Sequence, residues 1–172
     1  MPDFIRVVNP GYWPEEEIIN NGYNIDNVNA DAITKDLKTT ENTLSLWALK
    51  DTNDVVLAMA SNSSRICDMY TLKLNNEIID KSDLEILNEP GNSRISDINP
   101  FHYNIKNLTY KKLSDVSKVI IESLKDVNNL NTFTKKDVIK ILKKAVLDKR
   151  LNIESLNDNV KKVVMKELDK DK

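Results

Sequence analysis

Apolar residues recur at helical spacing through the last third of the chain. Residues 110–124 carry an apolar side chain every three or four positions, which is the spacing of one helix face. A second run, from Val138, places apolar residues at i, i+3, i+4, i+7 and i+8, and a third continues to Leu168. The pattern predicts three helices between residues 109 and 172. Each helix has a polar residue placed to cap its first turn, and these residues are Thr109, Thr134 and Asn157. The second helix also has the spacing of a capping box, with Asp137 in the usual Glu position.

The first 108 residues show shorter and more mixed patterns. Alternating or β-rich segments predict strands at 4–8, 43–49, 66–74 and 85–87, and residues 77–79 are predicted to pair back after a turn at Asn75-Asn76. Helix signals predict short helices from Pro14 to Asn21 and from Ala30 to Lys38, the latter capped by Asn29.

Four further segments complete the expected layout. The run 55–61 is too short for its period to separate a buried strand from a buried helix, and Asn53 or Asp54 is placed to cap a helix there. Glu89-Pro90-Gly91-Asn92 predicts a type II turn. Residues 93–108 look irregular, and residues 128–131 look like a polar linker.

Together these elements predict the α+β class, with a small and mainly antiparallel sheet. We expect an α+β domain over residues 1–108 and a helical region of about three helices over residues 109–172. The helical region either stands apart or packs on the first part as one domain. The apolar content of 40% and the charged content of 30% lie in the globular range.

The composition restricts the chemistry that the chain can carry. It has one His, one Cys and three Gly in 172 residues. Metal sites need several ligands at defined spacing, phosphate loops need grouped glycines, and most nucleophiles need a neighbouring His. We therefore expect no metal and no cofactor. Cys67 lies in a predicted strand, so a buried packing role is expected for it.

His102 is the one candidate for acid–base catalysis. Asp97, Ser93 and Ser96 lie near it in sequence, and a carboxylate beside a His is a common general-base arrangement. The competing interpretation is a surface or structurally hydrogen-bonded His in a Pro- and Asn-rich loop.

Charge divides the chain unevenly. Residues 1–110 hold 9 basic and 17 acidic side chains, whereas residues 111–172 hold 16 basic and 10 acidic ones. The lysines of the last helices suit contacts with phosphates or with an acidic protein surface, or form an ordinary solvated face. Trp13, in an expected exposed turn, is either an interface anchor or a cover for the core edge. The candidate binding residues are Trp13, Lys136, Lys140, Lys143, Lys144, Lys161 and Lys162.

The leading functional hypothesis is a non-enzymatic protein-binding accessory module of a bacterium or phage, of antitoxin or immunity type. Its partner is another protein, and self-association is one form of this. A DNA-associated regulator that uses the lysine-rich helices is the first alternative, and a hydrolase or transferase centred on His102 is the second. The absence of a signal-peptide pattern at the start and of a long apolar run predicts a cytoplasmic protein without a membrane span.

Overall fold

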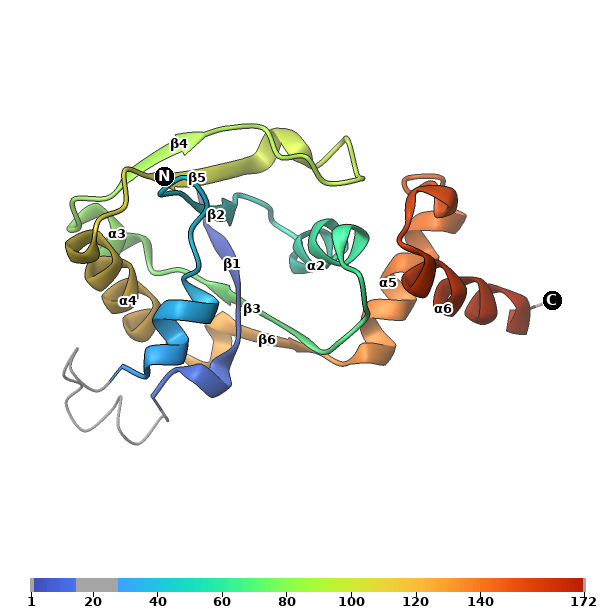
Figure 1. The fold of residues 1–172 in the computed structure, drawn as a ribbon, viewed down its shortest axis with the longest axis horizontal. Helices are drawn as coiled ribbons and strands as arrows, with labels where there is room; N and C mark the ends of the chain where they lie inside the picture. The colour runs from blue at the N-terminus through green and yellow to red at the C-terminus, as the bar shows by residue number, and fades with distance from the viewer. Residues whose placement is uncertain (1, 15–27, 172) are drawn as a thin grey trace.

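The computed structural model describes residues 2–14 and 28–171 (Figure 1). Its centre is a six-stranded antiparallel sheet with the strand order β4-β5-β2-β1-β3-β6. The prediction of an α+β fold with an antiparallel sheet is confirmed. The strands are β1 (Ile5–Val8), β2 (Leu44–Trp47), β3 (Met69–Lys73), β4 (Glu85–Asn88), β5 (His102–Lys106) and β6 (Leu130–Phe133).

Helices lie on both sides of this sheet. The α-helices are α2 (Thr52–Asn62), α3 (Asn76–Asp80), α4 (Tyr110–Leu124), α5 (Lys135–Leu147) and α6 (Asp158–Leu168). A π-helical segment, η3, spans Ala32–Asp36. Short 3-10 turns are η1 (Pro10–Tyr12), η4 (Asn99–Phe101), η5 (Val127–Asn129), η6 (Ile153–Ser155) and η7 (Asp169–Asp171).

Strand alternation divides the buried side chains into two cores. Phe4, Leu46 and Ile105 lie in the core that α4 covers with Val116 and Ile120. Neighbouring strand residues point to the opposite face because side chains alternate along a strand. The second core contains the following residues of β1, β2, α2, α5 and α6: Ile5, Trp47, Val56, Leu142 and Val164.

The last helices extend from the second face. α2 contacts β1 and β3, α5 packs against α2, and α6 packs against α5. Figure 1 shows α5 and α6 at one end of the molecule, with α3 and α4 at the other. β6 lies between α4 and α5 in the chain and pairs with β3. Both predicted regions therefore contribute strands to one sheet. Whether residues 1–108 and 109–172 fold independently stays a prediction.

The predicted helices of the C-terminal region are confirmed. Thr109 accepts from the Lys112 N–H at 3.4 Å, and Thr134 and Asp137 form the expected capping box. Asn157 precedes α6 but makes no side-chain cap. Its amide donates instead to the Ser63 carbonyl at 2.7 Å, so it joins α6 to the end of α2.

Two predictions near the middle of the chain are corrected. The ambiguous run 55–61 belongs to α2, and its cap is Asp51, whose carboxylate accepts from the Asn53 N–H at 2.8 Å. Residues 77–79 do not pair back as a strand. They lie in α3, because the Asn75 side chain caps a helix by accepting from the Glu77 N–H.

Two strands lie in segments expected to be irregular. Residues 93–108 contain η4 and β5, which pairs with β2 and β4. The polar linker 128–131 contains most of η5 and the start of β6, an edge strand in which Thr132 is exposed.

Four local predictions are wrong, hold only in part or lie outside the described part. Gly91 does not adopt the left-handed conformation that a type II turn requires, and close contacts explain this glycine better, because a Cβ there would lie 3.1 Å from the Trp47 ring. Cys67 is exposed. The helix expected at 30–38 forms but is mostly π-helical. The helix predicted from Pro14 to Asn21 falls mainly on residues outside the described ranges.

Candidate functional site

His102 has a structural environment at the start of β5. Its ring lies edge-on to Trp47, with 4.8 Å between the ring centroids. Nδ1 lies 2.7 Å from the main-chain carbonyl of Glu89. A carbonyl oxygen is an acceptor, so we assign the ring hydrogen to Nδ1. This bond joins the segment after β4 to β5.

The neighbours expected for a catalytic His102 are bonded elsewhere. The Asp97 carboxylate accepts from Arg150, at 2.8 Å from one Nη atom. The Ser93 hydroxyl donates to the Asn99 side chain at 2.6 Å. The structure therefore does not bring His102, Asp97 and Ser93 together as an acid–base set.

Glu89 holds the same region through its side chain. Its carboxylate accepts from Lys106 Nζ at 2.9 Å and from the Asn104 amide at 2.6 Å. These hydrogen bonds, that from Lys106 first, lower the pKa of Glu89 below its ordinary value. The polar outer side chains of β5 thus fix the connection between β4 and β5.

Trp13 is buried, contrary to the expected exposure. It is 3% exposed, and its indole N–H donates to the Asp36 carboxylate at 2.6 Å. In this conformation Trp13 covers the core rather than presenting a surface anchor.

The candidate lysines separate into two groups. Lys136, Lys140 and Lys144 recur every four residues along α5, opposite the buried Val138 and Leu142. The side chains of Lys140 and Lys144 are 76% and 77% exposed. We call this set of three the α5 lysine row.

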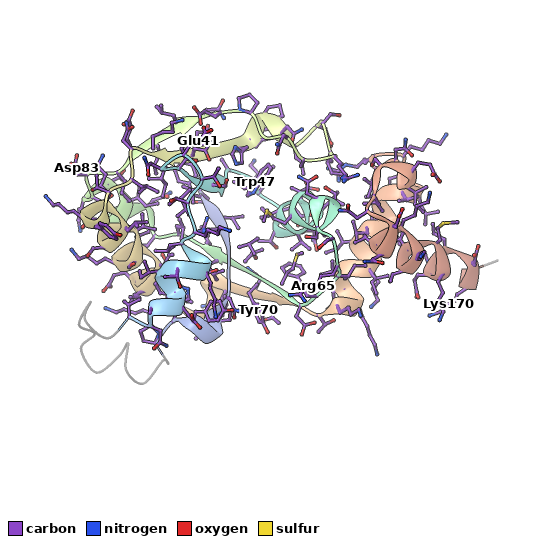
Figure 2. All side chains as sticks on the ribbon, in the orientation of Figure 1. Glu41, Trp47, Arg65, Tyr70, Asp83 and Lys170 are labelled. Atoms are coloured by element: carbon purple, nitrogen blue, oxygen red, sulfur yellow. The ribbon has the colours of Figure 1, made fainter. Side chains whose placement is uncertain are left out.

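The other candidate lysines lie around α6. Lys143 is half-buried and donates to the main-chain carbonyl of Glu167 at 3.2 Å, so it links α5 to α6. Lys161 forms an ion pair with Glu154, and Lys162 is exposed on α6. In Figure 2 the charged side chains of α5 and α6 project at the end of the molecule opposite Asp83.

A cleft of about 340 Å³ lies between the start of α2 and α5. The aliphatic side chains that line it are Leu57, Ile141 and Ala145. Around them stand polar groups of both charges, which are Asp51, Asn53, Lys140, Lys144, Asp148 and Arg150. We call this feature the α2–α5 cleft.

Arg150 ties the two sides of this cleft together. Its guanidinium donates to the Asp54 carboxylate at 2.9 Å and to Asp97 at 2.8 and 3.1 Å. These acids, Asp54 first, raise the pKa of Arg150 above its ordinary value. Arg150 is 34% exposed, so the cluster is only partly screened by water.

The members of this cluster lie far apart in the sequence. Arg150 is 96 residues from Asp54 and 53 residues from Asp97. No local spacing relates them. The one sequence signal is the Arg itself, a residue suited to bidentate contacts among many lysines.

Within residues 2–14 and 28–171, no group of three or more His, Cys, Asp and Glu side chains is arranged to hold a metal ion. No helix in that part of the chain has the length and apolar character needed to cross a bilayer.

Comparisons with models of known protein families, with curated proteins and with solved structures find no match to this chain. Function is therefore inferred from the geometry of the α2–α5 cleft and its surroundings.

Proposed function

We propose that this protein is a non-enzymatic module that docks another protein through the α2–α5 cleft and the adjoining face of α5. The observation that supports this most is the make-up of the cleft. Leu57, Ile141 and Ala145 lie among charged groups of both signs. An apolar centre inside a polar rim is the usual arrangement of a protein–protein interface. A surface of this kind supports a docking role of the antitoxin or immunity type.

The exposed face of α5 adds apolar area beside the cleft. Leu147 is 62% exposed and lies three residues after Lys144, so it continues the side of the helix that carries the α5 lysine row. A large aliphatic side chain at such a place gains free energy when a partner covers it.

DNA binding is the second candidate, and the α5 lysine row is what favours it, because regularly spaced lysines can neutralise phosphates. However, Asp137 lies 3.9 Å from Lys140, and Asp148 pairs with Lys144. These acids weaken the field that a phosphate backbone would meet. The aliphatic lining of the cleft offers neither positive charge nor hydrogen-bond donors to a phosphate.

A site-specific crosslinking experiment tests the proposal. The photoreactive residue p-benzoylphenylalanine is placed at Lys144 in cells of the source, and the same residue at Asp83 serves as the control at the opposite end of the molecule. We expect a discrete protein adduct from the Lys144 position and none from the Asp83 position.

The adduct is then identified by mass spectrometry, and the partner is purified and titrated. A Lys140→Glu/Lys144→Glu double variant should weaken its binding by about tenfold or more. Adducts of equal yield from both positions, or crosslinking to nucleic acid from Lys144, would contradict the proposal.

A further inference from the structure

The positive charge of the C-terminal region is concentrated on α5 and the loop that follows it. Residues 135–150 hold seven basic side chains and two acidic ones, a net charge of +5. A partner that covers this helix meets a field that favours negative charge.

The acids beside the cleft are already engaged within the protein. Asp51 accepts from the Asn53 N–H as the cap of α2, and Asp54 accepts from Arg150. The Asp137 carboxylate bonds to both the N–H and the hydroxyl of Thr134. Lys140 lies 3.9 Å from that carboxylate and Lys144 pairs with Asp148, but both lysines are more than three-quarters exposed, so these ion pairs are weak and carboxylates of a partner can replace them.

The geometry of α5 sets the spacing of the charges that a partner should carry. Lys140 and Lys144 are one helical turn apart on the rim of the cleft, and both are largely exposed. Residues four apart on a second helix have similar spacing, so two carboxylates on successive turns can face these two lysines. Ile141 lines the same cleft and is partly exposed, whereas Leu57 and Ala145 beside it are buried, so an aliphatic side chain of that helix can pack against Ile141.

We infer that the occupant of the α2–α5 cleft is an acidic amphipathic helix of a partner protein. Its carboxylates pair with Lys140 and Lys144, and a Leu-like side chain enters the cleft against Ile141. This inference rests on the proposed function and specifies the chemistry of the partner.

Designed peptides test the inference without knowledge of the natural partner. The probe is a short fluorescein-labelled helical peptide with glutamates four residues apart and leucines on the adjoining face. Two control peptides replace its glutamates by glutamine or its leucines by serine. A duplex DNA of matched charge is the fourth probe. Binding to the full-length protein is followed by fluorescence anisotropy at low and at physiological salt, because salt screens exposed charges.

We expect the Glu/Leu peptide to bind, and each control peptide and the DNA to bind more weakly. Lys140→Glu/Lys144→Glu should reduce peptide affinity by about tenfold or more. The matched control, Lys162→Glu/Lys166→Glu, makes the same charge change at the same spacing on α6, where both lysines are exposed. It should leave the affinity within about twofold of wild type, since exposed charges beyond the contact are screened. Circular dichroism checks that both variants fold.

The inference is wrong if the peptide does not bind, if the two double variants weaken it equally, or if the DNA binds more tightly than the peptide. If a protein crosslinks at Lys144 but the peptide does not bind, the proposed docking function is retained. Only the inference that the partner presents an acidic helix is then overturned. Absence of both results would overturn both.

Discussion

Asp36 shows how one side chain can hold several segments of this fold. Its carboxylate accepts from the Asn9 N–H at 3.1 Å and from the Trp13 indole at 2.6 Å. Its main-chain carbonyl accepts from Arg6, whose guanidinium also bonds to the Ser45 carbonyl. Burial lowers the pKa of Arg6 to about 10, while the charge of Asp36 opposes that shift. The end of β1, η3 and the indole of Trp13 thus depend on one residue.

Replacement of this residue should destabilise the fold. We expect Asp36→Ala to lower the free energy of unfolding by about 1–3 kcal/mol, because it leaves the buried indole N–H without an acceptor. The measurement is urea denaturation followed by tryptophan fluorescence. The control is Asp31→Ala, since Asp31 forms an exposed ion pair with Lys35 in the same segment, and such pairs contribute about 0–1 kcal/mol. Equal losses in the two variants would count against the role given to Asp36.

At the scale of elements, α5 owes its start to a reciprocal cap. The Thr134 hydroxyl accepts from the Asp137 N–H, and the Asp137 carboxylate accepts from the Thr134 N–H at 3.1 Å. The hydrogen bonds from Thr134 lower the pKa of Asp137 below its ordinary value. A carboxylate with a lowered pKa in the folded state adds stability above its unfolded pKa, and this contribution is lost as the pH falls through the folded value.

This linkage predicts a specific acid sensitivity. In a series of unfolding curves from neutral pH down to the range where carboxylates titrate, stability should fall less steeply for Asp137→Asn than for the wild type. Thr134→Val should flatten the curve in the same way, because it removes the hydroxyl that lowers the pKa. The double variant should change the slope no further than either single one, and additive changes would show that the two residues act separately.

The elements differ in how well the sequence predicts them. α4 and α5 are predicted because a strong helical period coincides with a capping residue at each start. β5 is missed, although Tyr103 and Ile105 alternate with polar neighbours as a strand with one buried face requires. The Pro and Asn residues around it outweigh that signal because they also favour loops.

The candidate site is predicted in one respect and missed in another. The lysines of α5 follow from the helical period, since the polar side of an amphipathic helix is its exposed side. The cleft beside them is not predictable, because it depends on how α2 packs against α5 and on Arg150 reaching two distant acids. Tertiary contacts over such separations leave no trace in local spacing.

At the scale of the whole molecule, the sheet joins the two halves of the chain. α4 covers one face with Val116, Ile120 and Ile121, and β6 adds the strand next to β3. A fragment of residues 1–108 would expose the apolar side chains that these elements cover. We expect the fragment to lack a cooperative unfolding transition and dispersed amide signals by circular dichroism and NMR, whereas the full chain shows both. A cooperatively folding fragment would instead support two independent domains.

The cluster of Arg150 with Asp54 and Asp97 has a consequence for synthesis of the protein. Its two acids leave the ribosome long before Arg150 does, and α2 meets α5 only after most of the chain has been made. During much of translation, the apolar face of α2 that α5 later covers is therefore exposed. Nascent chains in this state aggregate or bind chaperones. If translation stops before Arg150, the truncated product therefore keeps this apolar surface exposed. It is then prone to aggregation, and only chaperones or proteases of the cell can prevent that.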